Sequence, residues 1–168
     1  AVFLLALPAR TQTILLHEFA GGTDDGLSPY DGLLLSGSTL YGMTHEGGDN
    51  DLGTVFKIQA DGSGFELLHE FAGGADDGQF PWGSLAISGT TLYGMTTSGG
   101  DANSGTLFNM EIDGSGYELL HEFAGGGNDG RGPRGALVVS GTTLYGMTAY
   151  GGDKDVGVVF KFDMGGGG

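Results

Sequence analysis

The sequence predicts an all-β protein built from three tandem units of 52 residues and four strands each. The motif LLHEFAGG occurs at residues 15–22, 67–74 and 119–126, and a second motif, LYGMT, repeats at the same interval of 52 residues. Apolar and polar residues alternate over short segments, and no segment has helical spacing. A period near 50 is typical of architectures in which neighbouring units bury one another's apolar faces.

The middle unit contains the four expected strands in chain order. They are residues 83–88, 91–96, 106–112 and 117–123. A two-residue link, Gly89-Thr90, suits a hairpin, and glycines at 114 and 116 supply the positive φ that a tight turn needs. Four strands per unit is the composition of a propeller blade, so we expect a propeller-like domain with pseudo-threefold symmetry. A β-prism, a trefoil-like arrangement and an open arc are the alternatives.

Composition limits the classes of partner. The chain has 37 glycines, which fall at fixed places in each unit and therefore indicate turns rather than disorder. Six Lys and Arg against 21 Asp and Glu give a formal net charge of −15. A field of that sign repels phosphate backbones and anionic lipid, so we expect no nucleic-acid partner and no membrane insertion. The absence of cysteine excludes disulfides and thiolate metal sites.

Several motifs recur together in the same order. They are LYGMT followed by Gly-Gly, GTVFKI at residues 53–58, LLHEF, and PWGSL at residues 81–85. Over residues 13–162 the chain resembles the GloVer tandem repeat of secreted and surface-attached bacterial proteins. The resemblance implies a β-propeller-like module without an assigned chemistry, located outside the cell or on its surface. With three units, the chain is shorter than the usual arrays.

The count of strands is uneven along the chain. From residue 32 onward, the first unit (32–71) and the second unit (83–123) have four strands each, whereas the third (135–163) has three. Residues 13–19 (TILLHEF) have the sequence of a fourth strand without a unit of their own. We therefore expect residues 10–163 to form one domain that closes by strand exchange between its ends. A Gly-rich tail, residues 164–168, has no assigned role.

Residues 1–9 form a surplus apolar segment. Residues 1–6 lie 52 positions before the third strand at 53–58, but residues 158–162 already fill the third-strand position of the last unit. One hypothesis is that this segment is a donor strand that inserts into a neighbouring copy. The tail of a secretory signal and packing within the same molecule are the alternatives. The side chains that would form the polymer interface are those of Val2, Phe3, Leu4, Leu5 and Leu7.

The leading functional hypothesis is a structural subunit of an extracellular filament, because head-to-tail donation of a strand that does not close gives a fibre. The alternative is a secreted module that binds a glycan or another surface ligand. Trp82 and Tyr150, each present in one unit only, could stack on a sugar ring. An enzyme is not expected. His-Glu pairs such as His69-Glu70 point to opposite faces of a strand, so hydrogen bonding by the triplicated histidines explains them better than catalysis.

Acidic loops are the candidate metal sites. Carboxylates in glycine-flanked bends suit calcium, although no loop has a complete calcium-binding motif. The interpretation that we favour is that these residues satisfy the backbone of turns. No other cofactor is expected. The residues are Asp24, Asp25, Asp49, Asp51, Asp76, Asp77, Asp153 and Asp155.

Overall fold

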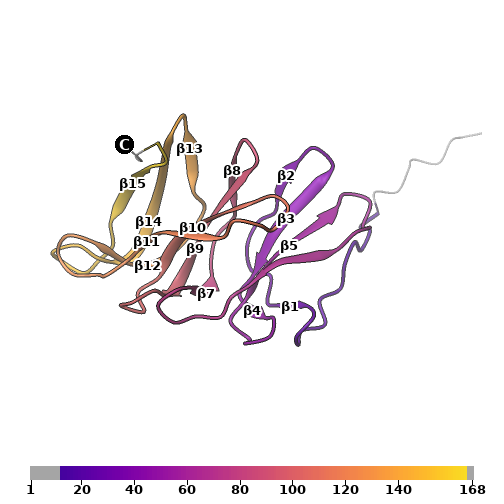
Figure 1. The fold of residues 1–168 in the computed structure, drawn as a ribbon, viewed down its shortest axis with the longest axis horizontal. Helices are drawn as coiled ribbons and strands as arrows, with labels where there is room; N and C mark the ends of the chain where they lie inside the picture. Colours follow the sequence, from indigo (N-terminus) through magenta and orange to yellow (C-terminus); the bar gives the residue numbers. More distant parts are fainter. Residues whose placement is uncertain (1–11, 166–168) are drawn as a thin grey trace, which may run out of the picture.

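The computed structural model describes residues 12–165, which form antiparallel strands and turns. This part of the chain contains no helix, so none of its residues forms a helix that could cross a membrane. Three main sheets lie side by side in a row (Figure 1). The first sheet, in purple, and the third sheet, in yellow, are at opposite ends of this row.

The first sheet is a meander of four strands in the order β2-β3-β5-β6. Its strands are β2 (Leu34–Ser36), β3 (Thr39–Thr44), β5 (Thr54–Gln59) and β6 (Glu66–Glu70). A separate two-stranded ribbon joins β1 (Gly26–Leu27) to β4 (Glu46–Gly47). The pairing of β5 with β6 shifts register between Val55 and Phe56, as a β-bulge does.

The second sheet repeats the meander with one added strand. Its strands are β7 (Gly78–Pro81), β8 (Ala86–Ser88), β9 (Thr91–Gly99), β10 (Thr106–Glu111) and β11 (Glu118–Glu122). The four strands predicted for the middle unit are confirmed with slightly different bounds. The sequence analysis missed β7, because its sequence GQFP contains the glycine and proline that mark turns.

The third sheet has only three strands of the meander. Its strands are β12 (Gly130–Pro133), β13 (Val138–Ser140), β14 (Thr143–Gly151) and β15 (Val159–Asp163). Strand β12 corresponds to β7 and was missed for the same reason. Strand β15 pairs with β14 on one side, and no described residue pairs with its other edge.

The core fills the spaces between consecutive sheets. Successive side chains of a strand point to opposite faces, so Leu92 and Met110 face the first sheet, while Tyr93 and Met95 face the third. Each sheet therefore contributes to two cores if it has a neighbour on both sides. Only the second sheet has two neighbours within the described residues.

The predicted closure of the domain by its own termini is wrong for the described residues, which form an open arc. Residues 12–19 are not in a strand, and they pack against the first sheet instead of β15. The reason is that the side chains of Leu16, His17 and Phe19 already find apolar partners at that end of the row.

Candidate assembly site at the junctions between sheets

The junction between the first and second sheets is centred on His69 of β6. The ring of His69 stacks on that of Tyr117, with centroids 3.9 Å apart and planes 7° from parallel. Phe71, which is buried, packs edge-on against Phe108 of β10 at 5.4 Å. The fourth strand of one sheet thus contributes the rings that cover the next sheet.

A carboxylate completes this junction. His69 Nε2 lies 3.2 Å from both oxygens of Asp77, which also accepts hydrogen bonds from the backbone N–H groups of Ala72 and Gly78, each at 2.7 Å. Burial raises the pKa of Asp77, but the hydrogen bonds from His69, Tyr117 and Ala72 outweigh this effect, and the net pKa is lowered. Burial, together with the Asp77 carboxylate, raises the pKa of the Tyr117 hydroxyl. The histidine and the carboxylate hold the loop after β6 in place.

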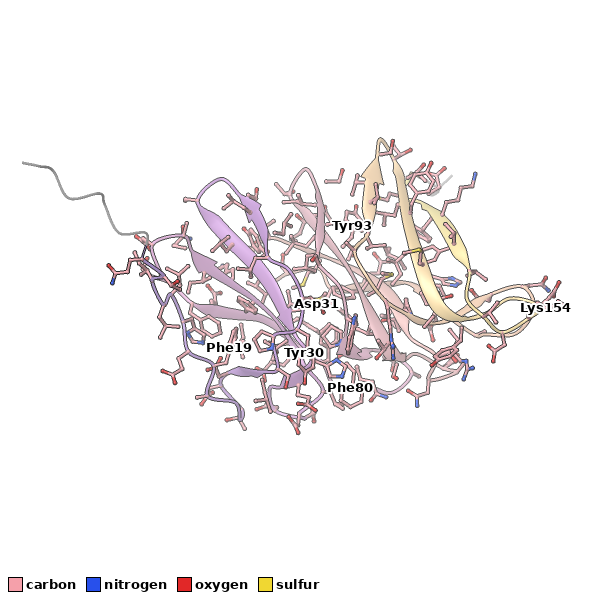
Figure 2. All side chains as sticks on the ribbon, turned by 180° about the vertical axis from the view of Figure 1, so that it is seen from behind. Phe19, Tyr30, Asp31, Phe80, Tyr93 and Lys154 are labelled. Carbon is pink, nitrogen blue, oxygen red and sulfur yellow. The ribbon has the colours of Figure 1, made fainter. Side chains whose placement is uncertain are left out.

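The same geometry occurs at the outer end of the first sheet, although no strand is present there. His17 stacks on Phe65 at 3.7 Å, and its Nε2 lies 3.1 Å from Asp25. Phe19 packs edge-on against Phe56 at 5.2 Å, below the first sheet in Figure 2. Residues 13–19 therefore have the position of a fourth strand whose own sheet is missing from the described residues.

The junction between the second and third sheets is incomplete. His121 lies 3.2 Å from Asp129, and Phe123 packs against Phe160 at 5.2 Å, but no described ring stacks on His121. The side chain of His121 is 42% exposed, compared with 19% for His69. A cavity of about 180 Å³ lies at this place. It is lined by Leu107, His121, Phe123, Asp129, Phe160, Lys161 and Phe162.

The outer face of the third sheet exposes apolar residues whose counterparts are buried. Val159 is 78% exposed, whereas Val55 and Leu107, at the same position in the other two sheets, are fully buried. Met147 is 56% exposed, and its counterpart Met95 is buried. We define the C-terminal end face by Val138, Tyr145, Met147, Val156 and Val159.

The outer face of the first sheet also exposes an apolar residue whose counterparts are buried. Leu33 is 54% exposed, whereas its counterparts Leu85 and Leu137 are buried. We define the N-terminal end face by residues 13–19 together with Tyr30, Leu33 and Leu35. No large apolar residue of the second sheet is exposed in the described part of the chain.

The structure does not bring the predicted calcium ligands together. Asp25 and Asp77 bind histidine and backbone amides, as described above. Asp51 and Asp155 have positive φ and accept hydrogen bonds from the N–H groups of Gly47 and Gly151. The remaining four, Asp24, Asp49, Asp76 and Asp153, are exposed. Within residues 12–165, no three acidic or histidine side chains converge on one point.

The two candidate sugar-binding aromatics both have cationic neighbours. The indole of Trp82 contacts the rings of Tyr30 and His45, and the guanidinium of Arg134 lies 5.1 Å from its centroid. The ring of His45 also packs against those of Tyr30 and Phe80, which are labelled in Figure 2. Tyr150 has Arg131 over its ring at 4.9 Å. Trp82, which follows β7 of the second sheet, therefore packs between residues of the first unit and a residue of the third.

The sequence analysis named Asp25 and Asp77 only as candidate calcium ligands, and it missed both the pairing of aspartates with histidines and the rings that stack on His17 and His69. The signal for this pairing was present, because an Asp follows each of the three repeated histidines by eight residues, at 25, 77 and 129. Phe65 and Tyr117 also share one position, which Thr13 occupies in the N-terminal segment. The proposed interface residues between 1 and 9 lie outside the described residues.

Comparisons with known proteins fit this repeated architecture. Residues 1–168 match the family model described as the Gloeobacter/Verrucomicrobia repeat. The chain belongs to this family. A search of curated proteins finds no match to this repeat chain.

The comparison with solved structures finds a match described as "Crystal structure of Nidogen/Laminin Complex". It has 15% sequence identity to the repeat chain and a TM-score of 0.46. The match covers 67% of the repeat chain and 36% of the other chain. The repeat chain thus matches about a third of that protein's length.

Proposed function

We propose that this repeat chain is a structural subunit that assembles head to tail with copies of itself, outside the cell or on its surface. The observation that carries the proposal is the pair of end faces. Each exposes residues whose counterparts are buried at the internal junctions, such as Leu33 at one end and Val159 at the other. Large exposed apolar patches are typical of interaction sites.

The filament expected from the sequence is one form of such an assembly. A head-to-tail contact between unlike faces gives a filament when its rotation does not close and a ring when it does. In both forms the C-terminal end face of one copy contacts the N-terminal end face of the next.

Sedimentation velocity of the 168-residue chain over a dilution series tests this proposal. We expect the sedimentation coefficient to rise with concentration, and we expect Val159→Asp to remove the rise because it places a charge in the apolar contact. The control, Thr90→Asp, adds the same charge to an exposed turn of the second sheet and should change nothing. A monomer at every concentration would contradict the proposal.

Deletion of residues 1–9 separates the donor-strand hypothesis from the end faces. If residues 1–9 are the donated strand, the shortened chain is monomeric. The end faces consist of residues from 13 onward, so we expect the shortened chain to assemble as the full chain does. Electron micrographs of the full chain and of the shortened chain then show whether both form the same assemblies.

A further inference from the structure

We infer that two copies close into a ring of six sheets, in which residues 13–19 of each copy form the fourth strand of the other copy's third sheet. This inference rests on the proposed head-to-tail assembly and adds its register and its closure. It depends on three features of the described residues: a positioned donor segment, a free acceptor strand, and contacts that recur at a fixed offset of 52 residues.

The donor segment is already held in the geometry of a fourth strand. The stacking distance of His17 on Phe65 is 3.7 Å, against 3.9 Å for His69 on Tyr117. The backbone of Leu16 also lies against Gly62 as that of Leu68 lies against Gly114. Strand β6, however, pairs with β5, whereas residues 12–19 pair with no described strand.

The acceptor is the free edge of β15. In the first sheet, the pairing of β5 with β6 places Val55 opposite His69, Phe56 opposite Leu67, and Lys57 opposite Glu66. Adding 104 to the residue numbers of β5 gives β15, and subtracting 52 from those of β6 gives the donor segment. The expected register between copies therefore pairs Val159 with His17, Phe160 with Leu15, and Lys161 with Ile14.

A glutamate supplies a further contact in the same register. Glu70 accepts a hydrogen bond from the backbone N–H of Asp49 at 2.7 Å, and Glu122 does the same for Asp101 at 2.6 Å. The third member of this series is the N–H of Asp153. Glu18 of the second copy would be its acceptor.

Close backbone contacts recur as well. A Cβ added to Gly83 would overlap the carbonyl group of Gly135, which lies on the next sheet. A Cβ added to Gly135 itself has no described atom within 4 Å. In the ring, the carbonyl group of Asp31 of the second copy would occupy this place.

Closure follows from repeating one junction. Propellers contain four to eight blades, so three sheets fall below that range and six sheets from two copies lie within it. A contact between unlike faces closes when its rotation completes a turn. Two copies then satisfy both end faces and leave no free edge on β15.

A double cysteine variant tests both register and closure. The chain has no cysteine of its own, and Lys57 and Glu66, the internal counterparts of Lys161 and Ile14, form an ion pair at 3.0 Å. Their side chains therefore touch. We expect oxidised Ile14→Cys/Lys161→Cys to run as a two-copy species of about 34 kDa, twice 17.1 kDa, without free thiols. A control with Thr23→Cys in place of Ile14→Cys should stay largely uncrosslinked.

Other products of this experiment have distinct meanings. A ladder of larger species would overturn the ring and leave head-to-tail assembly intact. Monomers with free thiols, together with a monomeric parent chain in sedimentation, would overturn both. Equal crosslinking in the Thr23→Cys control would overturn the register.

A glycine variant provides an independent check of the register. We expect Gly135→Ala to leave the fold of the separate copy intact and to reduce the two-copy fraction at least tenfold, because its Cβ meets the second copy. Gly141→Ala, at another positive-φ glycine with open space around it, is the matched control. Unchanged assembly of Gly135→Ala would contradict the inferred contact.

Discussion

Each junction holds a histidine between a carboxylate and, where the ring is present, an aromatic side chain. Tyr117 covers His69 and Phe65 covers His17, whereas His121 has no such ring among the described residues. The Nε2 atom of each triplicated histidine lies within hydrogen-bond distance of an aspartate. This is the hydrogen bonding that the sequence analysis expected of these residues.

The first residue-scale prediction concerns Asp77. Its pKa is lowered in the folded protein, so its ionised form stabilises the fold above its ordinary pKa of 3.8, and this contribution is lost as pH falls through the folded pKa. We expect Asp77→Asn to cost about 1 to 3 kcal/mol at neutral pH. As the pH falls from neutral through the lowered pKa of Asp77, the unfolding free energy of Asp77→Asn should depend less on pH than that of the parent chain.

Urea denaturation at several pH values measures this difference. The neighbouring Asp76 is exposed, so Asp76→Asn is the matched control and should follow the parent chain. An Asp77→Asn protein that loses stability in acid as steeply as the parent would contradict the assigned role of this carboxylate.

The second residue-scale prediction concerns Thr13. Residues 65 and 117 are aromatic at the position that Thr13 occupies, so His121 of a neighbouring copy would be covered by a small polar side chain. Thr13→Tyr would supply the missing ring. Because an aromatic pair adds about 0.5 to 1.5 kcal/mol beyond area burial, we expect the dissociation constant to fall about two- to tenfold.

Sedimentation equilibrium measures the dissociation constant of the Thr13→Tyr protein. Thr23→Tyr places the same ring on an exposed loop and is the control. Equal strengthening by both variants would indicate a nonspecific apolar effect.

At the scale of elements, the sequence predicted the meander strands and missed the outer ones. Strands β9 and β10 were predictable because they contain adjacent apolar residues, such as Leu92 and Tyr93, that are buried on both faces of the sheet. Strands β7 and β12 were not, because GQFP and GRGP contain turn-forming residues and are held by backbone pairing to β9 and β14. Residues 13–19 have the sequence of a strand, but a strand requires a partner that the described chain does not provide.

Two glycines, each three residues before β8 or β13, give an element-scale prediction. Gly83 and Gly135 both have positive φ, so alanine costs about 1 to 2 kcal/mol at each. At Gly83 the added Cβ would also overlap the Gly135 carbonyl group, which costs about 1 to 3 kcal/mol more. In the monomeric Val159→Asp background, where Gly135 meets no second copy, we therefore expect Gly83→Ala to have the lower melting temperature in calorimetry. Equal losses in that background would contradict a close contact between the second and third sheets.

At the scale of the whole molecule, the sequence predicted the repeat and its period but not how the chain ends. The closure of a propeller depends on where residues 13–19 pack, and their apolar side chains suit either the first sheet or the edge of β15. The structure places them on the first sheet, which leaves both end faces exposed. The assembly site could therefore not be read from composition, since its residues are the same types that form the core.

The charge of the whole molecule gives the last prediction. Each copy has a formal net charge of −15, so two copies repel one another, while the contact between their end faces is mainly apolar. Salt screens the repulsion, because the Debye length falls from about 10 Å at 0.1 M to about 3 Å at 1 M. We expect the two-copy fraction in sedimentation equilibrium to rise with sodium chloride concentration. A contact dominated by ion pairs would weaken instead, so a falling fraction would contradict an apolar interface.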